Sequence, residues 1–334
     1  MRIDPETVPV LLRRAGVVGA GGAGFPAYVK YQRPTKVYVA NCTESEPGYY
    51  GDKMLMKERP DVICKALKLL RDIFGYEKVY LAIKAKHTQY ATEVIHYAEE
   101  TGDFAMAYVP DQYRMGEEKA LTKHVTGIEV PRGAIPPKVG VTVQNTETLH
   151  NIYWALTEHR PVIYKFVQTI GEIRHDEVLQ APVGTPVQAV LRHAGHKDPD
   201  EVLKKHRLID GGPLLGEEIE EPGGHVVTRT TNGLLFVKPE NFKRRGKLYP
   251  LPDHEPPSRI QVVADEVDVV EVPLGGPYGE PAIPVVNEGD TVAAGQEIGH
   301  YDPEKLSVSA HASIPGVVTR VGPARIRIER QSGA

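Results

Sequence analysis

Residues 19–24 have the composition of an anion-binding turn. Four glycines fall within these six positions, namely Gly19, Gly21, Gly22 and Gly24. Because glycine has no Cβ, the backbone N–H groups of such a turn can approach a ligand closely and point at an anion. Lys30 adds a positive charge a few residues later. The alternative interpretation is a turn that only connects two elements.

Two further polar clusters lie at the ends of predicted elements. Asn41, Glu44 and Glu46 follow the strand predicted over residues 36–40, at the end of a strand where ligands of α/β sheets usually bind. Gly116 opens a predicted helix, and two adjacent carboxylates, Glu117 and Glu118, occupy its first turn, where negative charge is favourable. Solvated loop charges are the alternative for the first of these clusters.

Strand and helix patterns alternate over residues 1–158, which predicts a mainly parallel sheet covered on both faces. The predicted strands are residues 36–40, 78–83, 104–109 and 140–145. The predicted helices are residues 4–16, 61–74, 88–100 and 146–156, with a further one opening at Gly116. We therefore expect an α/β fold class for this part of the chain.

The second half is rich in turns and β patterns. Residues 159–238 resemble a small β-grasp domain, with a strand over 162–171 and a short helix over 187–194. Residues 239–258 are charged and proline-rich, as expected of a linker. Residues 259–334 alternate over short strands without a helix period, which predicts a compact all-β sandwich or barrel.

Composition excludes several classes of function. A net charge of -4 argues against general nucleic-acid binding, and no apolar run approaches the roughly 18 residues of a membrane span. The N-terminus has no apolar signal region, so we expect a cytoplasmic protein. Only Cys42 and Cys64 are present, without a C-x-x-C pair, and the histidines have no metal spacing. We expect no bound metal and, for Cys42, a small buried residue rather than a redox-active thiol.

Four stretches of the first domain, in order, together resemble the flavin- and NADH-binding subunit of respiratory complex I (the 51 kDa type). They are residues 19–30, 41–48, 113–121 and 143–149. The later chain is more similar to the RnfC protein of Rnf electron-transfer complexes and to cobalamin reductases of diol-utilising microcompartments. That similarity is carried by residues 210–216, 230–235, 279–298 and 311–318.

The resemblance implies a fold of three parts: a parallel-sheet FMN/NADH-binding α/β domain, a β-grasp domain of the SLBB type, and a C-terminal barrel-sandwich hybrid domain. It also implies roles for the polar clusters. The glycine segment, with Ala23, would lay backbone against FMN, and Lys30 would lie near the flavin phosphate or ring edge. Phe25 would stack on the nicotinamide. The remaining expected cofactor-binding residues are Asn41, Glu44 and Glu46 for ribose or nicotinamide, Gly116, Glu117 and Glu118 for the dinucleotide side, and Asn145 for the flavin ribityl or phosphate.

The sequence also departs from these relatives. They carry iron–sulfur clusters, whereas this sequence has no cysteine after Cys64, so the usual outlet for single electrons is missing. Thr43 stands where the complex I proteins have an aspartate, which removes one expected flavin contact.

The leading hypothesis is a flavoprotein in which FMN takes hydride from NADH and passes electrons to a protein partner with an iron–sulfur or corrinoid acceptor. No general acid or base is required, so no catalytic side chain is assigned. The alternative is a non-enzymatic scaffold that binds a partner through its later domains, and a third hypothesis is a pocket for a different nucleotide or anion. Whether the chain forms a homo-oligomer is left open.

Overall fold

The computed structural model describes residues 3–173, 176–242 and 255–331, which form two compact units. The first unit contains the described residues of Met1–Arg13, Ala27–Ser45 and Asp52–Arg160. The second contains Arg14–Pro26, Glu46–Gly51 and the described residues of Pro161–Ala334. Two segments from the N-terminal part of the sequence, 14–26 and 46–51, therefore group with the second unit, whereas the sequence analysis places them in the first domain.

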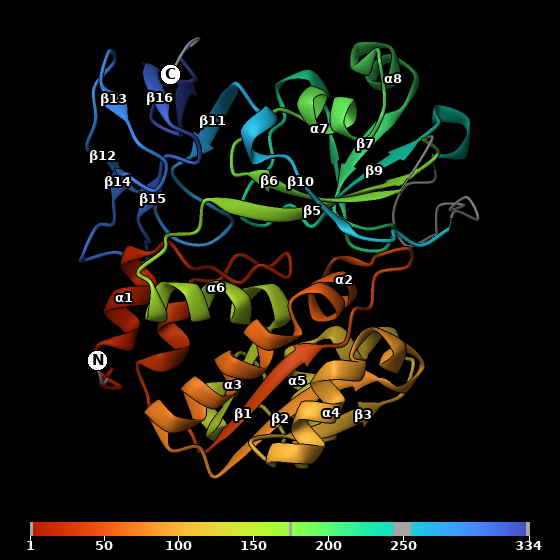
Figure 1. The fold of residues 1–334 in the computed structure, drawn as a ribbon, viewed down its shortest axis with the longest axis vertical. Helices are drawn as coiled ribbons and strands as arrows, with labels where there is room; N and C mark the ends of the chain where they lie inside the picture. Colours follow the sequence, from red (N-terminus) through yellow and green to blue (C-terminus); the bar gives the residue numbers. More distant parts are fainter. Residues whose placement is uncertain (1–2, 174–175, 243–254, 332–334) are drawn as a thin grey trace. The chain divides into compact units, whose positions relative to one another are not determined.

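A four-stranded parallel sheet forms the centre of the first unit, in the order β3-β2-β1-β4. Its strands are β1 (Val37–Cys42), β2 (Lys78–Lys84), β3 (Ala105–Val109) and β4 (Val141–Asn145). The expected parallel sheet is confirmed, with each predicted strand present to within one or two residues. All neighbouring strands pair in parallel, so their carboxyl ends share one edge, and Figure 1 shows β1, β2 and β3 of this sheet.

Both faces of this sheet are covered, because alternate residues of each strand point to opposite sides. Val39 and Val143 belong to an apolar cluster that includes Leu121 of α5 (Glu118–Thr126). Tyr38, on the other face of β1, lies 5.3 Å from Tyr76 between ring centroids. The central strands are therefore buried on both sides, as expected of an α/β domain.

Helices connect these strands in the predicted positions. They are α1 (Val8–Arg14), α3 (Pro60–Phe74), α4 (Thr92–Thr101) and α6 (Thr146–Thr157), with the short 3-10 turns η1 (Ala27–Tyr31), η2 (Ala85–Tyr90), η3 (Tyr113–Gly116) and η4 (Pro136–Val139). The helix expected to open at Gly116 begins instead at Glu118, after η3. One helix, α2 (Gly51–Glu58), was not predicted.

The second unit contains a mixed six-stranded sheet in the order β10-β6-β5-β9-β7-β8, together with two short helices, α7 and α8. The elements are β5 (Tyr164–Gly171), β6 (Glu177–Pro182), α7 (Val187–His193), α8 (Pro199–Lys205), β7 (Arg207–Asp210), β8 (Glu217–Ile219), η5 (Pro222–Gly224), β9 (Gly233–Val237), η6 (Pro239–Asn241) and β10 (Ile260–Val262). The apolar faces of β6, β9 and α7 share one core. This is the expected β-grasp module. Strand β10 pairs with β6, although the sequence analysis places it in the C-terminal domain.

Two small antiparallel sheets follow, in the orders β11-β17-β16-β13 and β12-β14-β15. They comprise η7 (Ala264–Glu266), β11 (Val269–Pro273), β12 (Ile283–Pro284), β13 (Thr291–Val292), β14 (Glu297–His300), β15 (Ala310–His311), β16 (Gly316–Val321) and β17 (Arg325–Glu329). Val270, Ile298 and Ile328 meet in their common core. The predicted all-β barrel-sandwich fold is confirmed. Residues 243–254 of the predicted linker lie outside the described residues.

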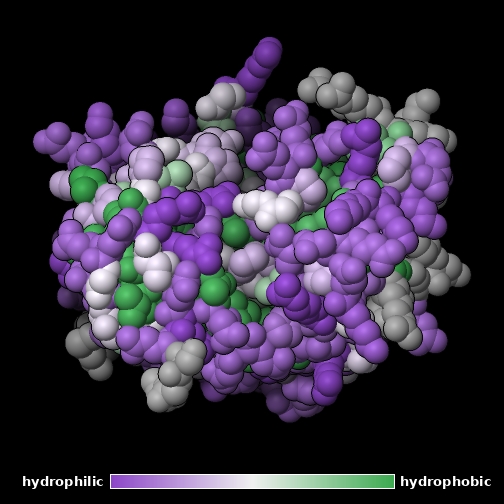
Figure 2. Space-filling view, turned by 90° about the horizontal axis from the view of Figure 1, so that it is seen from above, coloured by the Kyte–Doolittle hydropathy of each residue, from purple (hydrophilic) through white to green (hydrophobic). Residues whose placement is uncertain are grey.

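Hydrophilic residues dominate the face of the molecule drawn in Figure 2, and apolar residues form only small groups on it. Within the described ranges, no helix has the length and apolarity that a membrane crossing requires.

Candidate functional site

Asn41 and Asn145 lie side by side at the carboxyl edge of the parallel sheet. They are register partners near the ends of β1 and β4. The Asn145 Oδ1 accepts hydrogen bonds from the backbone N–H groups of Glu147 (3.0 Å) and Thr148 (3.2 Å) and so caps α6. Its Nδ2 donates to Asp52 Oδ2 at 2.6 Å. The first role of Asn145 in the structure is therefore to begin α6 and to hold Asp52.

Asn41 joins the end of β1 to the η3 segment. Its Nδ2 donates to the carbonyl oxygen of Gly116 at 3.0 Å, and its Oδ1 lies 2.7 Å from the Thr43 hydroxyl. That hydroxyl is also 2.7 Å from the Met115 carbonyl oxygen. A Cβ on Gly116 would approach Ser45 Oγ to 2.8 Å, so any larger residue there would require the Ser45 side chain to shift. Thr43 stands where the complex I proteins have an aspartate, and its hydroxyl bonds within the protein to Asn41 and Met115.

Lys30 is a buried cation that pairs with the carboxylate of Glu118, in the first turn of α5. Its side chain is 7% exposed and its Nζ donates to Glu118 Oε1 and to the Val143 carbonyl oxygen, the latter at 2.8 Å. Glu118 occupies the first turn of α5, where the helix dipole also favours a carboxylate. Lys30 and Glu118, 88 positions apart, are therefore brought together, whereas Glu117 is exposed.

A second buried lysine lies at the start of α2. Lys53 is 5% exposed, and burial is the main cause that lowers its pKa to about 8, with Lys86 and Lys84 lowering it further and Glu44 opposing them. The Glu44 Oε2 accepts a hydrogen bond from the Asp52 backbone N–H at 3.3 Å. The sequence analysis missed Asp52 and Lys53, although both follow the predicted acidic cluster directly in the chain.

The glycine segment belongs to the second unit and is closed by its own backbone. Gly19 N–H donates to the Phe25 carbonyl oxygen at 2.8 Å, and Gly24 N–H donates to that of Gly19 at 3.0 Å. Val18 and Pro26 form an isolated antiparallel bridge at its base. Residues 21–23 are exposed at the tip. The result is a fixed turn that presents backbone with almost no side chains.

Gly22 and Gly24 have backbone conformations that suit glycine, with φ values of +100° and +69°. A Cβ on Gly24 would also lie 2.8 Å from both Pro277 Cδ and Thr230 Cγ2, so this glycine is required for packing. The tip at Gly22 approaches Asn232, whose Oδ1 accepts a hydrogen bond of 2.7 Å from the buried Lys165 Nζ. The sequence analysis did not connect Lys165 or Asn232 with the turn.

Two other expected site residues also have partners within the second unit. The Phe25 ring meets the Tyr278 ring edge-on, with centroids 5.8 Å apart. Glu46 Oε2 accepts a hydrogen bond of 3.0 Å from the Leu214 N–H and lies where a side chain on Gly212 would collide with it. The expected site residues therefore divide between the units: one group surrounds the sheet edge in the first unit, whereas the second unit contains the glycine turn with Phe25 and, against residues 212–214, Glu46.

Both cysteines lie in the protein interior. Cys42 and Cys64 are free and buried, and burial raises the pKa of both thiols, that of Cys64 to about 12. Across residues 3–173, 176–242 and 255–331, no group of three or more histidine, cysteine or acidic side chains could hold a metal ion.

Two family models match this chain. Residues 12–154 match the Nuo51 FMN-binding domain, and residues 252–333 match the RnfC barrel-sandwich hybrid domain. The chain is 35% identical over 241 residues to the RnfC-type protein of the ion-translocating oxidoreductase complex of Rhodobacter capsulatus, covering 70% of this chain and 45% of that protein. It is 32% identical over 237 residues to the cobalamin reductase PduS of Citrobacter freundii, covering 70% and 50%. By sequence, the chain is therefore similar to RnfC-type proteins and cobalamin reductases over about 70% of its length.

Solved structures agree at the level of the fold. An NAD+-reducing [NiFe]-hydrogenase in its H2-reduced state matches 70% of this chain and 47% of the other, with a TM-score of 0.58 and 18% identity. At 18% identity, the match supports the fold assignment alone. The chain spans about half the length of the curated relatives named above.

Proposed function

We propose that this chain is an FMN-dependent electron-transfer flavoprotein that oxidises NADH and passes the electrons to a protein partner. The observation that carries the proposal is the glycine turn, which presents the exposed backbone of residues 21–23 and is held closed by two hydrogen bonds at its base. A turn with so few side chains is suited to close approach of a planar or anionic ligand. The match of residues 12–154 to an FMN-binding domain supports flavin as that ligand.

The residues present fit a flavin nucleotide in their chemistry. In the second unit, the exposed residues Gly21, Gly22 and Ala23 would supply backbone donors, Gly19 and Gly24 would close the turn behind them, and Phe25 would offer an aromatic face for a nicotinamide. In the first unit, Asn41, Glu44, Gly116, Glu117, Glu118 and Asn145 would offer hydrogen-bond partners, while Lys30 holds Glu118 in place. Glu46 would act from the second unit. Bound FMN would supply the hydride acceptance and the onward electron transfer.

The names of two relatives support a redox partner as the electron acceptor. One is named as part of an ion-translocating oxidoreductase complex and another as a cobalamin reductase. Both names imply a redox partner, so we propose a protein that presents an iron–sulfur or corrinoid centre as acceptor. The cytoplasmic location remains a prediction.

Absorbance of the purified protein tests the proposal. We expect a yellow protein, or a colourless one that takes up added FMN in equal amount, whose flavin absorbance is bleached by NADH without oxygen. A protein that ignores both FMN and NADH would instead favour the scaffold hypothesis. That hypothesis has structural support of its own, because the Lys30 cation and the Asn145 amide are already engaged within the protein.

A further inference from the structure

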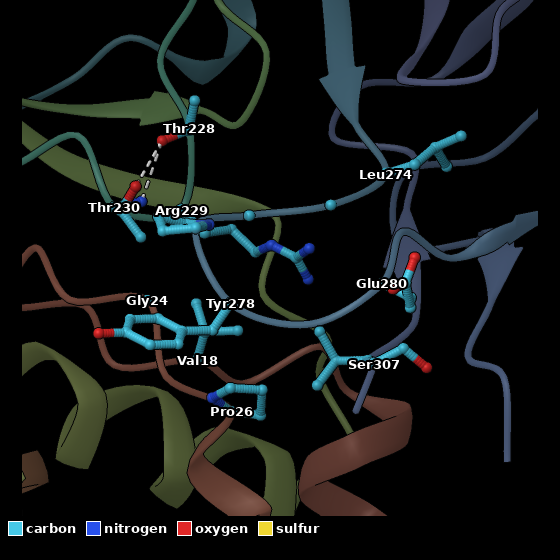
Figure 3. Close-up of a pocket in the computed structure, with 14 residues that line it drawn as sticks. Val18, Gly24, Pro26, Thr228, Arg229, Thr230, Leu274, Tyr278, Glu280 and Ser307 are labelled. Carbon is cyan, nitrogen blue, oxygen red and sulfur yellow. Dashed lines mark hydrogen bonds between the residues drawn. The ribbon is translucent and has the colours of Figure 1, made fainter. Parts of the chain in front are cut away.

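The second unit contains a hollow next to a buried cation. Its lining comes from the ends of the glycine turn, from Thr228, Arg229 and Thr230, and from the loop after β11, and it is open to solvent. Figure 3 shows the Arg229 side chain extending into this hollow, below the strand end at Leu274. All of these residues lie within one unit.

Arg229 is 8% exposed and has no counterion among the described residues. Its Nη1 donates to two backbone carbonyl oxygens, those of Gly16 at 3.2 Å and Ser309 at 3.0 Å. Burial alone lowers its pKa, to about 10, so the guanidinium keeps its charge at neutral pH. A buried charge that lacks a partner of opposite sign is costly, so an external anion would be favourable here.

The acidic groups Asp210 and Glu297 form hydrogen bonds and ion pairs with residues other than Arg229. Asp210, at the end of β7, accepts hydrogen bonds from Thr231 (2.8 Å) and pairs with His225 (3.0 Å). Glu297 accepts from Ser309 Oγ at 2.6 Å and pairs with His300. His311 is partly buried near Arg229, and its pKa is lowered to about 4, mainly by burial, so it is neutral at pH 7. Glu280, which lines the hollow, is exposed.

The residues around Arg229 hold its guanidinium group in one position. Gly16 has φ +73°, and a Cβ there would lie 2.6 Å from the Ser309 carbonyl oxygen and 3.0 Å from Arg229 Nη1. The Thr228 and Thr230 hydroxyls lie 2.9 Å apart and fix the turn that carries Arg229. In the described structure Nε and Nη2 of Arg229 make no hydrogen bond to the protein. Two parallel N–H donors of a guanidinium match the two oxygens of a carboxylate or phosphate.

We propose that this hollow binds a small oxyanion, a carboxylate or a phosphate, through the Nε and Nη2 edge of Arg229. The inference goes beyond the proposed flavin chemistry, because it needs neither FMN nor NADH. Since FMN also carries a phosphate, the test has to separate a free oxyanion from the phosphate of the cofactor.

Calorimetric titration of the full chain at low ionic strength tests the proposal, with inorganic phosphate and acetate as probes and sodium chloride as the control for screening. We expect saturable binding of at least one oxyanion, with little effect of chloride. Arg229→Gln should abolish the binding. Arg229→Lys keeps the charge but loses the two-pronged edge, so binding should weaken about tenfold. Arg207→Gln, which removes an arginine from the exposed pair with Glu218, should leave binding unchanged.

Three results would overturn the proposal. The first is binding that is equal in the wild type and in a folded Arg229→Lys protein, a comparison that stays decisive if Arg229→Gln does not fold. The second is absence of oxyanion binding by folded wild-type protein. The third is loss of phosphate binding when FMN is added, which would assign the phosphate to the cofactor. Flavin binding with no oxyanion binding would leave the proposed function standing and remove only this site.

Discussion

The two units differ in how they neutralise buried positive charge. In the first, Lys30 pairs with Glu118 and the buried Lys84 pairs with Asp111 at 3.1 Å. In the second, Arg229 donates only to carbonyl oxygens. In the first unit, Lys30 and Lys84 are therefore paired before any ligand arrives, and a ligand can be recognised by shape and hydrogen bonding. In the second unit, the buried guanidinium of Arg229 has no counterion among the described residues, so an external anion can pair with it.

The two units also differ in whether side chains or backbone groups are presented to a ligand. In the first unit, side chains define the sheet edge, and Asn41, Asn145 and Thr43 each have a protein partner. In the second unit, the exposed tip at residues 21–23 offers backbone alone. We infer that the sheet edge of the first unit would recognise a ligand through side-chain hydrogen bonds, whereas the glycine turn would do so through its backbone.

Acid should produce the largest effect, and it should act on the first unit through His150. Trp154 Nε1 donates to His150 Nε2 at 3.1 Å, which requires a neutral imidazole, and burial is the main cause that lowers the His150 pKa from 6.5 to about 4. Because the folded pKa is the lower one, the stabilisation is complete above about pH 6.5 and is lost as the pH falls towards 4. The loss amounts to about 3 kcal/mol.

Trp154 is the only tryptophan, so its fluorescence follows the first unit during acid unfolding. His150→Gln preserves an acceptor for the indole and should shift the acid midpoint to lower pH. His311→Gln, in the second unit, serves as the matched control and should leave the fluorescence midpoint in place. Equal midpoints for wild type and His150→Gln would show that His150 is not the group that titrates.

Blocking the glycine turn should give the next largest effect. Gly21 is exposed and is not among the glycines with positive φ, so valine can be placed there without backbone strain. We expect Gly21→Val to weaken FMN binding at least about a hundredfold by preventing close approach, with an unchanged melting temperature. Gly224→Ala is the control, because a Cβ at Gly224 meets nothing within 4 Å. Flavin fluorescence quenching measures both, and full FMN affinity in Gly21→Val would exclude the turn as the cradle.

The sequence predicts the strands of the first unit well for a physical reason. The strands β1 and β4 are largely buried on both faces, and polar residues follow each of them. The helix α3 has a single apolar stripe, with Pro60 in its first turn and Gly75 after its end. The helix α2 escapes prediction because Met54, Leu55 and Met56 are consecutive and all fully buried, which gives no helical period. The helix α8 has only seven residues, too few for a period, although Asp198 caps it.

The composition of the two site groups is predictable, but their partners are not. Polar residues at strand ends and a glycine-rich turn are visible in the sequence, and the sheet edge does bring Asn41 and Asn145 together. The contact of Glu46 with Leu214 joins residues 168 positions apart, and local patterns contain no information on such a pair. Arg229 escapes for the same reason, because only tertiary packing buries it away from any counterion among the described residues.

Removing the Lys30 cation should test whether the first unit depends on its internal charge pairing. Lys30→Met keeps the length of the side chain but leaves Glu118 and the Val143 carbonyl oxygen without their donor. Because Glu118 is 38% exposed, water can partly replace the lysine, so we expect a loss of about 2 kcal/mol in urea unfolding. Lys36→Met, at an exposed pair with Glu77, should change stability by less than about 0.5 kcal/mol. Similar losses in both variants would contradict a special role for the Lys30 pair.

Asn145 offers the smallest effect and the sharpest distinction between a structural and a cofactor role. Asn145→Ala removes the cap of α6 and the bond to Asp52, and should cost about 1 kcal/mol or somewhat more. Asn145→Ser retains a capping oxygen and should recover part of that stability. If the side chain also contacts FMN, the serine variant should regain stability in urea unfolding but not its affinity in flavin titrations. FMN affinity that recovers together with stability would show that Asn145 acts on the flavin only by placing α6.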